Sequence, residues 1–184
     1  MSRFGDDTDC SDPEVVVVET RGARESIHRI PRKSPECHQI GPWQLLGTNL
    51  WFGTTFYGGE GETGAGRFGY FDPFARKYRF IAAPQLIDFS VSAILVQPSA
   101  VWLALKMRGE YGDYMGGIVR YDRAAKTFKR FDIAPSIGQQ FAMVGDRLLV
   151  AADRGVFVIH DDDVRGYFVD QTSDGRLRTV EGFR

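Results

Sequence analysis

The fold of this chain is decided by three short runs: NLWFGT at residues 49–54, GYFD at 69–72 and KYRF at 77–80. They return in the same order as AVWLAL at 100–105, GIVRYD at 117–122 and TFKRF at 127–131. The spacing is nearly constant, because Trp102 follows Trp51 by 51 residues and Asp122 follows Asp72 by 50. A period of this size, built from short β-type runs and turn residues, is typical of β-propeller blades. We therefore predict an all-β, propeller-like fold of four-stranded antiparallel blades.

A third copy of the repeat is shorter but keeps the order, with RLLVAA at 147–152, GVFVIHD at 155–161 and GYFV at 166–169. Its missing residues fall between the second and third strands, as expected where loops vary and strands persist. We label the strands of a blade a to d, from the propeller axis outward. The predicted full blades are residues 43–82, 90–132 and 141–169.

The two ends of the chain complete the predicted organisation. Residues 1–13 are expected to be disordered, residues 14–30 to form a half blade with only strands c and d, and residues 31–42 to link it to the first full blade. A last strand is expected at 177–180. Residues 14–184 then form a single domain of about three and a half blades, whereas closed propellers hold about four to eight.

This count leaves three arrangements open. In the first, the strand near Leu177 completes the half blade and closes a four-bladed ring. In the second, the chain is an open arc or a fragment of a longer propeller, and in the third two chains associate as a homo-oligomer. The open arc or fragment is favoured, because the C-terminal residues supply one strand where closure needs two.

Composition and charge exclude several classes of protein. The chain is 43% hydrophobic and 13% aromatic with 21 glycines, which suits a small all-β domain with many tight turns. A net charge of −1 with mixed signs gives no basic stripe, so nucleic acid is not an expected partner. The polar N-terminus has no apolar h-region, and the apolar stretch 91–107 is interrupted by Gln97-Pro98-Ser99. We therefore expect no membrane span and, by default, a cytoplasmic chain.

The blade phrase resembles a known family of repeats. LWFGT, GYFDP and KYRF between Leu50 and Phe80, with their echo from Val101 to Phe131, are similar to the two-component regulator propeller repeats of bacterial sensor proteins. They are more distantly similar to virginiamycin B lyase-like propellers. The resemblance covers roughly residues 43–170. It implies a propeller that acts as a ligand-sensing or protein-sensing module.

The two long loops predict a binding face. In an antiparallel blade the b–c and d–a connections emerge on one face of the disc, and the loops 56–68 and 108–116 are both b–c connections. Aromatic rings with nearby carboxylates can hold a sugar, a cationic ligand or a basic peptide segment. The alternative is that both loops are solvated and bind nothing. The candidate ligand-binding residues are Phe56, Tyr57, Glu60, Glu62, Glu110, Tyr111, Asp113 and Tyr114.

Signals for catalysis or metal binding are sparse. His28 and His160 lie within or at the end of predicted strands, and His160 belongs on the face opposite the long loops. The Cys and His residues have no paired metal-ligand spacing, and Asp161-Asp162-Asp163 is typical of a c–d turn rather than a calcium loop. We therefore expect no catalytic residue, metal or cofactor, and a non-catalytic module that binds a ligand or protein through its b–c loop face.

An enzyme is the alternative function. It would be a propeller-type lyase or hydrolase whose site is completed by a missing part of the chain or by a partner subunit. The aligned tryptophans Trp51 and Trp102 are assigned to packing between blades, because a large ring on strand b fills the space between two sheets. Trp43, which follows Gly41-Pro42 at the start of a blade, is left open between packing and ligand contact.

Overall fold

A computed structural model describes residues 16–21, 24–29, 37–57, 66–109, 112–134, 136–171 and 177–182. These residues contain fifteen strands and one short 3-10 helix, Pro84–Leu86, so the all-β prediction is confirmed. The N-terminal sheet pairs β1 (Val16–Arg21) with β2 (Arg24–Arg29). Blade 1 contains β3 (Cys37–Leu46), β4 (Asn49–Tyr57), β5 (Phe68–Asp72) and β6 (Lys77–Ile81). Blade 2 contains β7 (Ser90–Val96), β8 (Ala100–Gly109), β9 (Gly112–Asp122) and β10 (Thr127–Phe131).

Blade 3 is larger, with five strands instead of four. It contains β11 (Gly138–Val144), β12 (Arg147–Ala152), β13 (Gly155–His160), β14 (Asp163–Gln171) and β15 (Leu177–Glu181). In each of these three sheets, the strands are hydrogen-bonded in chain order and every neighbouring pair is antiparallel. The inner strand of each blade is therefore its strand a, namely β3, β7 and β11.

Several strand boundaries differ from the predicted ones, and blade 3, for example, begins at Gly138 rather than at residue 141. β3 begins at Cys37, so residues 37–42, expected in the link, belong to the first strand of blade 1. The expected loop at 108–116 is mostly a β-hairpin, because Arg108 pairs with Asp113 and Gly109 with Gly112. A two-stranded ladder can continue past the core, since its hydrogen bonds do not require apolar side chains on either face.

The first interface between blades is formed by alternate residues of two neighbouring sheets. Blade 1 contributes Trp51 and Phe68, and blade 2 contributes Val101, Leu103 and Val119, all buried in one apolar cluster. We call the face of a blade that is turned toward the next blade its forward face, and the opposite face its rear face. Val101, Leu103 and Val119 thus define the rear face of blade 2.

The second interface repeats this pattern one blade further along. The forward face of blade 2 buries Trp102, Ala104 and Ile118, and the rear face of blade 3 buries Leu148 and Val150 in the same cluster. Strand β8 is therefore apolar at successive positions because its two faces pack against different blades. The prediction that Trp51 and Trp102 fill the space between blades is confirmed.

The c–d turns explain why the aspartates of the repeat recur. In blade 1, Asp72 Oδ1 accepts hydrogen bonds from the backbone amides of Phe74 and Ala75 at 2.9 and 3.0 Å. In blade 2, Asp122 Oδ1 accepts them from Ala124 and Ala125 at 3.0 and 2.9 Å. An aspartate that bonds the amides two and three residues ahead holds the tight turn between two strands.

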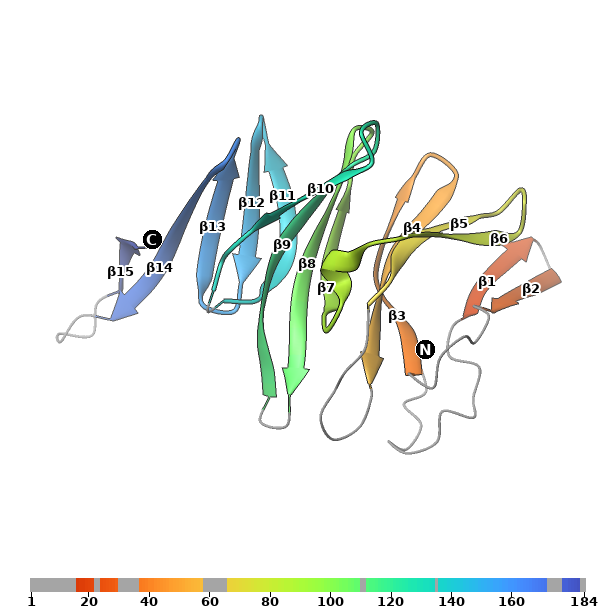
Figure 1. Cartoon of the computed structure of the whole chain (residues 1–184), viewed down its shortest axis with the longest axis horizontal. Helices are drawn as coiled ribbons and strands as arrows, with labels where there is room; N and C mark the ends of the chain where they lie inside the picture. Colours follow the sequence, from red (N-terminus) through yellow and green to blue (C-terminus); the bar gives the residue numbers. More distant parts are fainter. Residues whose placement is uncertain are drawn as a thin grey trace.

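The sheets stand in an open row (Figure 1). The N-terminal sheet β1–β2 lies at one end and β15 at the other, with the inner strands β3, β7 and β11 next to one another between them. β15 pairs with β14, from Tyr167 opposite Glu181 to Gln171 opposite Leu177. It therefore extends blade 3 and does not complete the N-terminal half blade. The alternative of a four-bladed ring closed by this strand is wrong. In the part of the chain that the structure describes, no helix is long and apolar enough to cross a membrane.

Candidate functional site

The three inner strands share an irregularity at one level of the row. In β3 the register shifts between Ile40 and Trp43, in β7 between Val91 and Ala93, and in β11 between Gly138 and Gln140. The extra residues are Gly41-Pro42, Ser92 and Gln139. A β-bulge re-aims side chains and frees backbone groups from the ladder, and bulges are over-represented beside functional sites.

The bulges also hold the inner strands against one another. Ser92 Oγ, at the bulge of β7, donates to the carbonyl oxygen of Gly138 at 2.7 Å, across the boundary between blades 2 and 3. Gly41, at the bulge of β3, is close to β7, because a Cβ at this position would lie 3.3 Å from the carbonyl oxygen of Val91. The three bulges are therefore neighbours in space although they are about fifty residues apart in sequence.

One further contact fixes the spacing of β3 and β7. The backbone amide of Val96 donates to Gln44 Oε1 at 2.7 Å, and Gln44 Nε2 donates to the carbonyl oxygen of Val96 at 3.3 Å. The side chain of Gln44 thus bonds the neighbouring inner strand as a short backbone segment would. This contact lies toward the a–b ends of the two strands, where Gln44 pairs with Trp51 and Val96 with Val101.

A hollow of about 390 Å³ lies over the bulges. Its wall is uncharged, and the exposed indole of Trp43 is its largest side chain, with 61% of its surface accessible. Gln139 and Gln140 add exposed amides, and Phe141 adds a half-buried ring. The lining residues are Gly41, Pro42, Trp43, Ser92, Ala93, Ile94, Gln139, Gln140 and Phe141.

The hollow lies toward the b–c connections. Gly138, just before the bulge of β11, pairs with Ala152, the last residue of β12 before the b–c turn of blade 3. The bulge of β7 is likewise in the half of that strand where Ser90 pairs with Lys106 of β8. In Figure 1 the β8–β9 hairpin and the end of β4 extend on this same side, beyond the β12–β13 turn.

The residues predicted as the binding site are placed only in part. Phe56 and Tyr57 are the last two residues of β4, where they pair with His38 and Cys37. Asp113 and Tyr114 belong to β9. The side chains of these four residues lie outside what the structure describes, as do residues Glu60, Glu62, Glu110 and Tyr111 altogether.

Sequence analysis missed the hollow, although it contained one signal for it. Gly41-Pro42 lies inside β3, and a proline inside a strand marks an edge or a bulge, because proline cannot donate to the ladder. Ser92 and Gln139 carry no comparable signal, since both residue types occur in ordinary strands. Trp43, which the sequence left open between packing and ligand contact, lies in the wall of the hollow.

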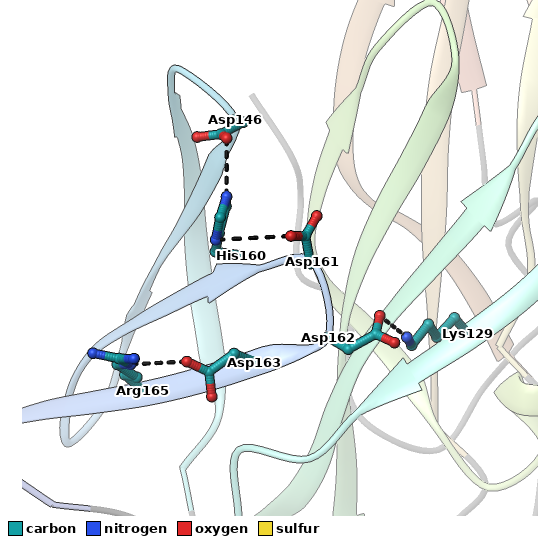
Figure 2. Close-up of polar contacts among 7 residues, drawn as sticks. All are labelled: Lys129, Asp146, His160, Asp161, Asp162, Asp163 and Arg165. Carbon is teal, nitrogen blue, oxygen red and sulfur yellow. Dashed lines mark hydrogen bonds and ion pairs between the residues drawn. The ribbon is translucent and has the colours of Figure 1, made fainter.

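A polar cluster on the opposite side has a different character (Figure 2). His160 Nε2 lies 2.9 Å from Asp146 Oδ2, and His160 Nδ1 lies 4.0 Å from Asp161 Oδ2. The hydrogen bond from His160 lowers the pKa of the Asp146 carboxyl below its ordinary value. The cluster connects the a–b turn of blade 3 to its c–d turn, and Lys129 of β10 bonds Asp162 across the blade boundary. We interpret these contacts as stabilising the a–b and c–d turns of blade 3.

The aspartates at 161–163 form the predicted turn. Asp161 and Asp162 make the turn, Asp163 begins β14, and Asp163 bonds Arg165 at 2.8 Å. Among the described residues, no group of three or more His, Cys, Asp or Glu side chains is placed to hold a metal ion. The cysteine and histidine side chains considered for metal binding, other than His160, lie outside the described part: Cys10, His28, Cys37 and His38.

Comparisons with known proteins identify similar structures but no family. No protein-family model and no curated protein matches the chain. Two solved structures from B. thetaiotaomicron that match it are described as the extracellular domain of the hybrid two component system BT4673 and of the one component system BT4673. They are 16% and 14% identical, with TM-scores of 0.47 and 0.46, and the match covers 78% and 84% of this chain. The chain spans 24% and 27% of their lengths.

These structures bear on two predictions. Both belong to the class of sensor proteins that the repeat resembles, whereas the distant resemblance to virginiamycin B lyase-like propellers is not confirmed. Both are described as extracellular domains, whereas a cytoplasmic location was expected for this chain by default, and that expectation is withdrawn.

Proposed function

We propose that this chain is a non-catalytic propeller module that binds a small uncharged ligand of carbohydrate type in the hollow over the inner strands. The observation that carries the proposal is the alignment of the three bulges. Three separate blades break register at one level, and the hollow lies at that level. Bulges are over-represented beside functional sites, and small-molecule sites are concave surfaces.

The chemistry of the wall selects the class of ligand. The exposed indole of Trp43 offers a flat apolar surface, and a sugar ring presents a matching apolar face of C–H groups. The amides of Gln139 and Gln140 each carry a donor and an acceptor, which suit the hydroxyl groups of a sugar. None of the nine lining side chains is titratable, so the wall favours a neutral ligand over the cationic one that the loops also allowed. A volume of about 390 Å³ falls within the range of about 300–1,000 Å³ of small-molecule sites.

We expect the b–c connections to supply the rim of the proposed site. Tyr57, Glu60, Tyr111 and Asp113 are the residues from which we expect rim contacts, because b–c connections emerge on the side of the blades toward which the hollow lies. Rim contacts add orientation and selectivity to a ligand that the hollow anchors. The division of roles is testable, since the two sets of residues do not overlap.

The test is a binding screen of neutral mono- and oligosaccharides by calorimetry. The affinity of the best ligand is then measured for variants of the proposed site. Trp43→Ala is expected to weaken binding at least about tenfold, equivalent to about 1.4 kcal/mol, because it removes the stacking surface. Phe74→Ala is the matched control, since Phe74 is an exposed aromatic residue in the c–d turn of blade 1, away from the hollow.

Two outcomes would contradict the proposal. In the first, no neutral saccharide binds. In the second, a ligand is found whose affinity is unchanged by Trp43→Ala and is lost when Tyr57, Glu60, Tyr111 and Asp113 are replaced together. That result would place the ligand at the rim alone. An affinity that is unchanged in both variants would also contradict the proposal, because the ligand would then bind at neither site.

A further inference from the structure

The forward face of blade 3 carries a group of aliphatic side chains that no other described element covers. Register partners lie on one face of a sheet, so this face can be followed across four strands. Leu149 pairs with Val158, Ala151 with Val156, and Val156 in turn with Tyr167. Val144, Val156 and Val169 have 59%, 43% and 67% of their surfaces exposed. The apolar residues of this face are Ala142, Val144, Leu149, Ala151, Val156, Val158, Tyr167 and Val169. The same register places polar and charged residues among them: Gln140, Arg147, His160, Asp163, Arg165, Thr179 and Glu181.

Three of the four equivalent positions in blade 2 are buried, and the fourth is Arg120. Trp102 pairs with Arg120 and Ala104 with Ile118, which makes these pairs the counterparts of Leu149 with Val158 and of Ala151 with Val156. Ala104 and Ile118 are inaccessible because the rear face of blade 3 covers them. Ala151 is exposed. The same strand position is thus an interface in blade 2 and a free surface in blade 3.

The covered forward faces of blades 1 and 2 indicate what kind of surface fits the forward face of blade 3. The two forward faces of blades 1 and 2 are both covered by a twisted sheet that presents alternate aliphatic and aromatic side chains. Arg165 and Asp163 lie on the forward face itself, as the register partners of Val158 and His160 (Figure 2), so charged side chains stand among the aliphatic ones. On such a surface the aliphatic side chains supply apolar contact and the charged groups select the orientation of a partner.

We propose that a second copy of this chain covers the forward face of blade 3 with its N-terminal sheet. The N-terminal sheet is a two-stranded antiparallel sheet at the other end of the row (Figure 1), and its Ile27 has 56% of its surface exposed. Ile27 is the register partner of Val18, near the middle of the two-stranded ladder. The sheet at one end of the row therefore offers an exposed aliphatic side chain to the uncovered face at the other end.

Head-to-tail pairing of two copies covers the forward face of blade 3 in both copies at once. Each copy has one forward face of blade 3 and one N-terminal sheet, so two copies related by a twofold axis make the same contact twice and close a ring. Together they hold six full blades and two two-stranded sheets. That number agrees with the usual size of closed propellers, about four to eight blades.

The experiment measures the mass of the purified full chain by sedimentation equilibrium over a range of concentrations. The wild type is expected to form a dimer whose fraction rises with concentration. Val156→Glu and Ile27→Glu should each abolish it, because either change places a carboxylate in both copies of the contact. Ile87→Glu is the matched control: Ile87 is an equally exposed aliphatic residue in the link between blades 1 and 2, and its variant should dimerise as the wild type does.

A mixture gives the sharpest result. Mixing the Val156→Glu and Ile27→Glu chains leaves one of the two contacts intact, so a heterodimer should return although neither chain dimerises alone. If Val156→Glu does not fold, as judged by circular dichroism, Val169→Glu on the same face replaces it. A wild type that stays monomeric overturns the proposal, as does a dimer that resists Val156→Glu. A dimer lost with Val156→Glu but retained with Ile27→Glu overturns the head-to-tail pairing.

Discussion

Replacing Trp102 with alanine tests the packing of the blades. Trp102 is 8% exposed, its ring lies 5.6 Å from that of Phe131 between centroids, and its Nε1 donates to Gln97 Oε1 at 3.2 Å. A buried aromatic side chain removes about 150–250 Å² from water, which corresponds to about 4–6 kcal/mol at about 25 cal/mol per Å². Alanine retains part of this, so we expect a loss of about 3–5 kcal/mol in the free energy of unfolding.

The assay is urea and thermal unfolding followed by far-UV circular dichroism, at one fixed protein concentration because association shifts apparent stability. In a domain of this size each kcal/mol shifts the Tm by about 2–4 °C, so the expected drop is about 6–20 °C. Trp43→Ala is the control, because Trp43 is mostly exposed and its loss should cost under about 1 kcal/mol. A Trp102→Ala variant that unfolds within about 1 kcal/mol of the wild type would refute the blade register.

Three smaller predictions test other parts of the scaffold. A Cβ at Gly53 would lie 2.4 Å from Val91 Cγ1, so Gly53→Ala should cost about 1–3 kcal/mol in chemical denaturation, and adding Val91→Ala should restore part of it; simple additivity of the two losses would contradict this contact. Gln44→Leu removes both hydrogen bonds between β3 and β7 and should cost about 1–2 kcal/mol by the same measurement; an unchanged midpoint would show that the amide bonds contribute nothing. The backbone hydrogen bond from Ala125 is the main cause that lowers the pKa of Asp122 below 3.8. Its stabilisation is therefore present above that pH and is lost as the pH falls through the lower folded value, so stability should fall less steeply with acid in Asp122→Asn than in the wild type.

The blade pattern was predictable because it is local and repeated. The predicted third-blade strands 147–152 and 155–160 agree with β12 and β13, since Gly145 and the pair Asp153-Arg154 mark their limits with turn residues. The burial of Trp51 and Trp102 followed from strands that are apolar on both faces. These features depend on neighbouring residues and on the fifty-residue period, both of which the sequence displays.

Other features depend on contacts that the sequence does not display. The pairing of β15 with β14 could not be distinguished from pairing with the N-terminal sheet, because either sheet offers a free edge to one extra strand. The final aspartates of GIVRYD at 117–122 and GVFVIHD at 155–161 do not occupy the same position in their blades. By register, the counterpart of Asp122 is His160, the last residue of β13, and Asp161 lies in the turn. In a shortened repeat, only the pairing of strands fixes which residues correspond.

The candidate site likewise has one part that the sequence predicts and one part that it does not. The b–c connections were correctly assigned to one side of the blades, because strand order alone determines where they emerge. The hollow depends on the bulges, and each bulge lies in the ladder between an inner strand and its own strand b, so it depends on how those two strands pair. Ser92 illustrates this, since its hydrogen bond to Gly138 joins residues 46 positions apart that no local pattern connects.

The most direct test of the proposed binding site uses the three tryptophans as reporters in one spectrum. Their indole N–H signals are resolved by 15N-labelled NMR and assigned by single substitutions, and the chain is then titrated with neutral saccharides. Trp43 lies in the wall of the hollow, whereas Trp51 and Trp102 are buried between blades. The account predicts a saturable shift of the Trp43 signal while the other two stay in place. A saccharide that binds without moving the Trp43 signal, or a panel that moves none of the three, would contradict it.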